Sequence, residues 1–203
     1  MNTPLRIPLQ VNPEQAARLR ALQEVFAQGC NLVAPIVQQT RTWNRVALHH
    51  LSYRELRRQL PAMGSQMACN VIYSVSRSCR LVFQHPQSPF HLSRLGNRPL
   101  PLLHFSSRSP VYFDRHTLSI RDQRLSMYTL DGRIRFDITL QPTDRQRFES
   151  DKLREIVLSR RGEDGFDLTF WFNRESADTP HSQNDSAPES AALPEYIQIE
   201  ETA

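Results

Sequence analysis

The chain has 203 residues, of which 39% are hydrophobic, enough for one domain of ordinary size or two small ones. It contains no apolar run of the roughly 18 residues that a membrane-spanning helix requires. Its first residues lack the apolar core of a secretory signal peptide. Three widely separated cysteines, Cys30, Cys69 and Cys79, indicate reduced thiols in the cytoplasm rather than a disulfide framework.

The formal net charge of +4 combines two regions of opposite charge. Residues 174–203 contain seven acids and one arginine, a net charge of −6, so residues 1–173 carry a net charge of +10. Such an excess favours an anionic partner. Lys152 is the only lysine, and arginine binds phosphate in a bidentate manner and stacks on bases. A GC-rich genome also replaces lysine with arginine, so this preference is an equally good sign of genome composition.

A short strand at residues 5–11 is expected to lead into a long first helix. Asn12 and Gln15 flank Pro13 in the pattern of a capping box, which predicts the start of this helix. Apolar residues then follow at helical spacing as far as Val37. Pro35 is expected to kink the helix near its end.

Residues 43–50 are expected to form a second short helix or a loop. Ser52 followed by Glu55 has the pattern of another capping box, which predicts that a third helix starts at Ser52. The Leu60–Pro61 step ends this helix. Ser65 predicts the start of a fourth helix, which should run to about residue 83.

From residue 102 onward the pattern changes to short strands separated by polar turns. Asp131–Gly132 is typical of a hairpin turn. The alternation over residues 133–138 places Ile134, Phe136 and Ile138 inside, and the charged residues between them outside. The expected strands are residues 111–113, 117–120, 125–130, 133–140, 152–160 and 166–172.

The order of one strand, several helices and many further strands predicts an α+β fold. We expect a small antiparallel β-barrel formed by residues 1–11 and 100–173, with a helical insertion and connector at residues 12–99. Residues 174–203 are expected to form a disordered acidic tail, because they are rich in Ser, Asp, Glu, Pro and Ala. The end of this tail, residues 196–199, has some strand character.

No motif in the chain predicts catalysis, a bound metal or a cofactor. There is no CxxC, HExxH, glycine-rich phosphate loop or nucleophile with a plausible histidine partner. The adjacent His49 and His50 would point about 100° apart on a helix, which is poor geometry for sharing a metal. The scattered aspartates are mostly turn residues, although spacing alone leaves open a carboxylate site of a two-metal nuclease.

The basic residues are more informative, because aromatic side chains lie among them. This mixture suits base stacking combined with phosphate contacts. An ordinary solvated helix face is the alternative. The first cluster consists of Arg41, Arg45, Arg54, Arg57 and Arg58 around Trp43, His49, His50 and Tyr53, and Arg77 and Arg80 follow on the next helix.

Four segments together resemble the N-terminal part of TnpB, the transposon-encoded RNA-guided protein, and of the small type V CRISPR effectors. They are VNPEQAARLRALQEVFAQGCNLV (11–33), LHHLSYRELRRQLPAMGSQMACNVIYSVSRSCR (48–80), VYFDRHTLSI (111–120) and LDGRIRFDI (130–138). With residues 156–172, the likeness covers roughly residues 4–172. In that family the strands form a wedge barrel and the inserted helices form a recognition lobe. Together they hold a guide RNA and read a short duplex DNA motif beside the target.

The resemblance also implies which residues read the duplex motif. Asp114 is acidic and Cys69 is a weak hydrogen-bonding group, so the chain departs from the family at these two positions. The matching positions are His49, Tyr53, Ser65, Gln66, Cys69, Asp114 and Arg115. In the family a RuvC nuclease domain follows the wedge, and here the acidic tail takes that place. The sequence therefore predicts a module without a catalytic residue.

We expect a TnpB-like module that binds a guide RNA and target duplex DNA in the cytoplasm of a prokaryotic cell, associated with the nucleoid. A separate nuclease or effector subunit would act with it, and no membrane or cofactor would be involved. Three alternatives remain: a remnant of a truncated transposon gene, an RNA-independent DNA-binding regulator, and an enzyme with an unrecognised carboxylate site.

Overall fold

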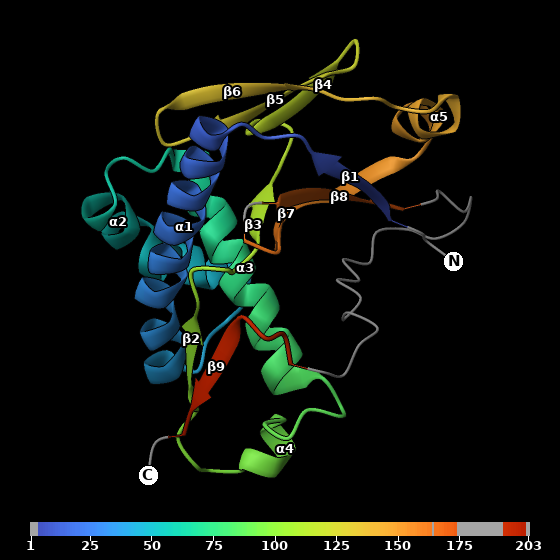
Figure 1. Ribbon diagram of the computed structural model, residues 1–203. Coiled ribbons are helices and arrows are strands. Elements are labelled where there is room, and N and C mark those ends of the chain that lie inside the picture. Colours follow the sequence, from blue (N-terminus) through green and yellow to red (C-terminus); the bar gives the residue numbers. More distant parts are fainter. Residues whose placement is uncertain (1–3, 164, 174–192, 202–203) are drawn as a thin grey trace. The chain divides into compact units, whose positions relative to one another are not determined.

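The computed structural model describes residues 4–163, 165–173 and 193–201 of the chain (Figure 1). Helices and antiparallel sheets are both present, so the predicted α+β class is confirmed. The strands of the described residues form three separate sheets and no closed barrel. None of the helices in this part of the chain is long and apolar enough to cross a membrane. The chain divides into two compact units, residues 1–22 with 110–183 and residues 23–109 with 184–203, which we call unit 1 and unit 2.

Unit 1 contains two antiparallel sheets. The first has the strand order β1-β8-β7-β3, and the second has the order β4-β5-β6. The strands of the first sheet are β1 (Leu5–Leu9), β3 (Val111–Phe113), β7 (Lys152–Arg161) and β8 (Gly165–Asn173). Those of the second are β4 (Leu118–Arg121), β5 (Arg124–Thr129) and β6 (Gly132–Asp137).

The core of unit 1 follows the alternation of its strands. Phe166, Leu168 and Phe170 of β8 are completely buried, because successive side chains of a strand point to opposite faces. The predicted alternation of residues 133–138 is confirmed: the three apolar side chains are buried and the charged ones are exposed. The predicted hairpin is also confirmed, with Gly132 at the turn and a backbone φ of 92°.

Helix α5 (Pro142–Ser150) of unit 1 lies in a segment for which no helix was predicted. It begins with a capping box, in which the side chains of Gln141 and Asp144 accept hydrogen bonds from each other's backbone amides. Phe148 of α5 packs edge-on against Phe170 and Phe172, with ring centroids 5.2 and 5.1 Å apart. The sequence signal was present at Gln141 and Asp144, but none of the residues of α5 is fully buried, so its apolar periodicity is weak.

Helix α1 (Pro13–Thr40) starts in unit 1 and continues into unit 2 from Gln23. Its predicted start is confirmed: the amide of Gln15 donates to Asn12 Oδ1 (2.8 Å), and the amide of Asn12 donates to Gln15 Oε1 (3.0 Å). The helix continues through Pro35 as far as Thr40. In unit 2 it approaches α3 closely at Gly29, where a Cβ atom would lie 3.1 Å from Val71 Cγ1.

Unit 2 also contains the helical hairpin of α2 (Arg45–Gln59) and α3 (Ser65–Gln84), followed by the short α4 (Leu92–Leu95). The predicted start of α3 at Ser65 is confirmed. The predicted helix start at Ser52 is wrong, because Asn44 caps α2 eight residues earlier, accepting hydrogen bonds from the amides of Val46 and Ala47. Ser52 is instead buried inside α2, where its hydroxyl donates to the carbonyl of Leu48 (2.7 Å).

The C-terminal segment forms strand β9 (Ile197–Glu200), which pairs with β2 (Leu102–Phe105) in an antiparallel two-stranded sheet of unit 2 (Figure 1). The prediction that disorder extends to residue 203 is therefore wrong for residues 197–200. Ile197 is buried, and its burial together with the backbone pairing explains the order. Residues 174–192 and 202–203 of the predicted tail lie outside the described residues.

Candidate nucleic-acid interface

One side of α2 carries a row of basic and aromatic residues: Arg45, His49, Tyr53 and Arg57. They are four residues apart, so they follow one another along the helix. The rings of His49 and Tyr53 are stacked, with centroids 4.6 Å apart and an interplanar angle of 18°. The neighbouring row of α2, formed by Leu48, Ser52 and Leu56, is buried and holds the helix on the rest of unit 2.

Helix α3 presents one partly exposed row between its buried positions. The row is formed by Gln66, Cys69, Tyr73, Arg77 and Arg80, which are three or four residues apart. Most of the remaining side chains of α3 are buried, including Asn70. Asn70 therefore lies inside the unit, although its spacing from Gln66 would allow it to share that face.

Two contacts align these rows with each other. The Arg45 guanidinium carbon lies 5.3 Å from the centre of the Tyr73 ring, and Arg57 Nη1 donates to the carbonyl of Met63 in the turn before α3. At 1.5 Å per residue, Arg45 and Arg57 are about 18 Å apart along α2, and Ser65 and Tyr73 are about 12 Å apart along α3. Arg45 thus lies near Tyr73 and Arg57 lies near the turn before α3, so the two rows run antiparallel.

We call this combined area the α2–α3 surface. It comprises Arg45, His49, Tyr53, Arg57, Gln66, Cys69 and Tyr73. Six of these were candidates from the sequence. Tyr73 was not, although its spacing of four residues from Cys69 is the signal that would have identified it.

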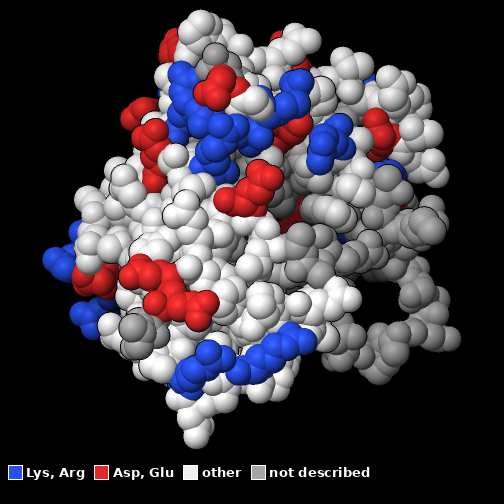
Figure 2. All heavy atoms as spheres, turned by 60° about the horizontal axis from the view of Figure 1, so that its bottom comes forward, with Lys and Arg blue, Asp and Glu red and all other residues white. Residues whose placement is uncertain are grey.

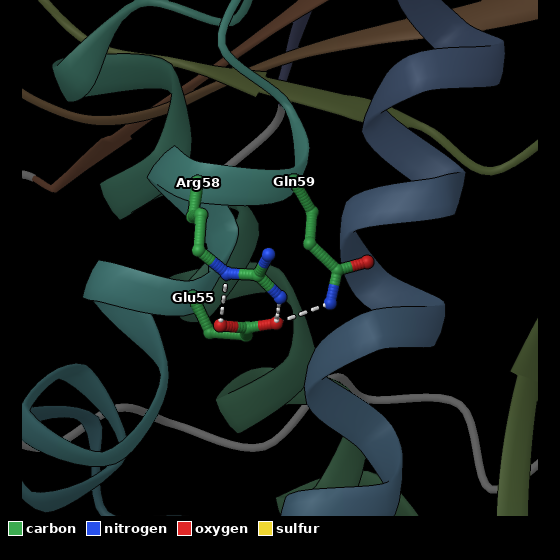
Figure 3. Close-up of polar contacts among 3 residues, drawn as sticks. All are labelled: Glu55, Arg58 and Gln59. Atoms are coloured by element: carbon green, nitrogen blue, oxygen red, sulfur yellow. Dashed lines mark hydrogen bonds and ion pairs between the residues drawn. The ribbon is translucent and has the colours of Figure 1, made fainter.

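Several predicted phosphate-binding arginines have structural partners. Arg57 is occupied by the carbonyl of Met63. Arg41 ends α1 with a backbone φ of 52°, and its side chain donates to the carbonyl of Arg98 (3.0 Å). Arg58 forms an ion pair with Glu55, its Nε lying 2.9 Å from Glu55 Oε2 (Figure 3).

Glu55 accepts hydrogen bonds from both Arg58 and Gln59 (Figure 3). The bonds from Arg58, followed by that from Gln59, lower the pKa of the Glu55 carboxyl from 4.5 to about 2. Its negative charge is thus compensated within α2. Arg54 lies one residue earlier, is exposed, and makes no hydrogen bond or ion pair with the described residues. It is the α2 arginine best placed to meet an external phosphate.

Positive charge is concentrated around these helices. From Val25 to Phe113 the chain contains ten arginines and a single acid, Glu55. On the face drawn in Figure 2, basic side chains form several separate groups, with acidic groups and uncharged surface between them. On this face a polyanion would thus meet local groups of basic side chains.

Two of the predicted readers, Asp114 and Arg115, belong to unit 1. The Asp114 carboxylate accepts hydrogen bonds from the backbone amides of His116 (2.9 Å) and Thr117 (3.1 Å), so it closes the turn before β4. Arg115 is exposed and lines an open hollow of about 530 Å³ that is also lined by Gln123, Arg145 and Phe148. The structure thus gives Asp114 a structural role and places Arg115 at an open hollow of unit 1.

The cysteines give no sign of thiol chemistry or metal binding. Cys30 and Cys79 are buried, and loss of water around the thiolate raises the pKa of Cys30 to about 12 and that of Cys79 further. Cys69 is half-exposed on the α2–α3 surface. Nowhere in the described ranges do three or more His, Cys, Asp or Glu side chains form a group that could hold a metal ion.

Neither the models of known protein families nor the curated proteins include a match to this chain. The resemblance to TnpB therefore rests on the sequence segments quoted above and on residues 156–172.

Proposed function

We propose that the α2–α3 surface binds nucleic acid and that the chain acts as a TnpB-like module, which holds a guide RNA and reads a short motif in target duplex DNA. The observation that carries this proposal is the antiparallel alignment of two rows of basic, aromatic and amide side chains. They are fixed at one end by Arg45 on Tyr73 and at the other by Arg57 on Met63.

The side chains of this surface suit different parts of a nucleic acid. The stacked rings of His49 and Tyr53 provide an ordered aromatic group for bases, and Gln66 carries an amide that can bond adenine with two hydrogen bonds. Arg54 lies on the exposed face of α2, where a phosphate is accessible. Stacking and amide contacts would then recognise the base sequence, and contacts between arginine and phosphate would supply the affinity.

The wedge role is proposed for unit 1. Its β1-β8-β7-β3 sheet brings together the first strand of the chain and strands from beyond residue 110, which is the connectivity expected of the wedge. We propose that unit 1 contacts the RNA backbone. A nuclease or other effector subunit would be supplied by a separate chain, in the cytoplasm and close to the nucleoid.

Salt-dependent RNA binding tests this proposal. Fluorescence anisotropy with a structured RNA, between 50 and 300 mM NaCl, should give an affinity that falls steeply with salt, because phosphate neutralisation releases counterions. Arg54→Ala should weaken binding and reduce the slope of log K against log salt by about 0.7–0.9. The matched control is Arg94→Ala, which removes an exposed arginine of unit 2 outside the α2–α3 surface.

The proposal would be wrong if RNA affinity did not change with salt, or if the two variants lost affinity equally. Sequencing the RNA that co-purifies with the full chain separates a guide-binding module from a DNA-binding regulator. Enrichment of a single RNA species would support a guide-binding module. Absence of bound RNA, together with tight binding of duplex DNA, would support a DNA-binding regulator.

A further inference from the structure

Strand β2 of unit 2 is held in place without the help of β9. The side-chain amide of Asn31 in α1 pairs with the backbone of Phe105 in both directions: Asn31 Nδ2 donates to the Phe105 carbonyl (2.9 Å), and the Phe105 amide donates to Asn31 Oδ1 (2.7 Å). Leu103 and Phe105 are also buried, with 3% and 4% of their surface exposed. Helix α1 thus bonds the backbone of β2 on one edge, and the other edge can pair with an extended segment.

The chain's own C-terminal segment occupies this second edge through a small contact. Four residue pairs form the ladder, from Leu102 opposite Glu200 to Phe105 opposite Ile197, and the amide of Ser106 extends it by donating to the carbonyl of Tyr196 (2.9 Å). Ile197 is the one buried side chain among the described residues of the segment, 193–201. The ion pair between His104 and Glu200 (2.6 Å) is exposed. Pairing rests mainly on backbone hydrogen bonds, as in β-strand addition.

The connection between β9 and the rest of the chain is long. Strand β8 ends at Asn173 in unit 1 and β9 begins at Ile197 in unit 2, so 23 residues join them. At 3.3–3.6 Å per residue, such a segment can span at most about 80 Å. This length is enough for β9 to reach β2 of a neighbouring molecule. A connection of this length gives an effective concentration in roughly the millimolar range, so a second copy can compete only at high protein concentration.

We propose that the edge of β2 on which β9 lies is a binding site for an extended segment of the type Tyr-Ile-Gln-Ile-Glu, and that its second ligand, besides the tethered β9, is β9 of another copy of this chain. Exchange places Ile197 of one molecule against Phe105 of the other and reproduces the same ladder between chains. Two such exchanges close a symmetric dimer, because each molecule contributes one edge and one strand. This inference does not depend on nucleic-acid binding.

Mixed cysteine variants test the exchange in the full chain. His104 and Gln198 are directly opposite in the ladder and both are accessible, so cysteines at these positions are close enough for a disulfide. Cys69 is first replaced by serine, which leaves the buried Cys30 and Cys79 as the native thiols. One preparation then carries His104→Cys, and a second carries Gln198→Cys.

We expect mild oxidation of the mixture to form a disulfide between residues 104 and 198 of different chains, identified by peptide mapping. Its yield should rise with protein concentration, to as much as about half of the chains near the millimolar effective concentration of the tether. The control mixture replaces His104→Cys with Arg121→Cys, an exposed position in unit 1. A yield of the 104–198 link no greater than that of the control would overturn the proposal.

A third preparation carries both cysteines in one chain. It should form the intrachain disulfide at micromolar concentration, which shows that β9 docks on β2 in the register of the structure. Failure of this link in the single chain would also overturn the proposal, because there would then be no docked strand to exchange.

Discussion

The two compact units use the same side chain, arginine, in different ways. Residues 1–22 and 110–173, which make up most of unit 1, contain fourteen basic and twelve acidic residues. Residues 23–109 of unit 2 contain ten arginines and two glutamates. Almost all of the net positive charge of residues 1–173 therefore lies on residues 23–109 of unit 2.

In unit 1 the arginines have partners across or along the strands. Arg124 lies 3.4 Å from Asp137 on the neighbouring strand, and Arg161 lies 3.1 Å from Asp167. In unit 2 the ion pair between Arg58 and Glu55 uses one of only two acids in residues 23–109. Ion pairs of this kind stabilise the sheets of unit 1, whereas residues 23–109 of unit 2 have eight more arginines than acids (10 − 2), an excess that favours an anionic partner.

The largest expected effect concerns the attachment of α2, on which the contrast between the units depends. Leu48→Ala should lower the free energy of unfolding by about 2–5 kcal/mol, because Leu48 is completely buried. Leu51→Ala on the same helix should change it by less than about 0.5 kcal/mol, because that side chain is 49% exposed. Urea denaturation followed by circular dichroism measures both, and equal losses would mean that α2 packs through a different face.

The next prediction separates recognition of the base sequence from electrostatic attraction to the phosphates within unit 2. Gln66→Ala should remove about 1–3 kcal/mol of discrimination at one position of the duplex motif, whereas Arg54→Ala should weaken all sequences alike. Arg54 is the suitable comparison because Arg57 is needed for the turn at Met63. Selection from a randomised duplex library, in the presence of the bound RNA, measures both. An unchanged motif in Gln66→Ala would show that α3 does not read the base sequence.

A smaller effect concerns the acids that β9 brings to the arginine-rich unit. Replacing Glu195, Glu200 and Glu201 with glutamine should raise RNA affinity a few-fold at low salt, since three exposed negative charges leave unit 2. The gain should disappear near 1 M salt, where the Debye length is only about 3 Å. Anisotropy at two salt concentrations tests this, and an equal gain at both would indicate a structural rather than an electrostatic cause.

The smallest effect is the titration of Glu55. Its pKa of about 2 in the folded chain is below the ordinary value of 4.5, so the interaction with Arg58 contributes stability above pH 4.5 and loses it as the pH falls toward 2. In Arg58→Ala the pKa should rise toward 4.5. Carbon-detected NMR titration of the Glu55 carboxyl measures it, and the Arg54→Ala variant should leave it unchanged.

Sequence alone determined the features that depend on neighbouring residues. The starts of α1 and α3, the Asp131–Gly132 hairpin and the alternation of residues 133–138 follow from capping, turn chemistry and periodicity over a few positions. The start of α2 was missed because two capping patterns compete, at Asn44 and at Ser52. The buried row of Leu48, Ser52 and Leu56 decides between them, and such burial depends on the rest of unit 2.

Only the tertiary structure decided which side chains are already occupied and which segments meet. The sequence shows Arg41, Arg54 and Arg57 as equivalent charges, but two of them donate to backbone carbonyls of other segments. Likewise, β9 finds β2 across 96 residues of chain, a separation that no local pattern records. The physical reason is that a hydrogen bond or a buried side chain stabilises a structure only when its partner is present, and here the partners come from distant parts of the chain.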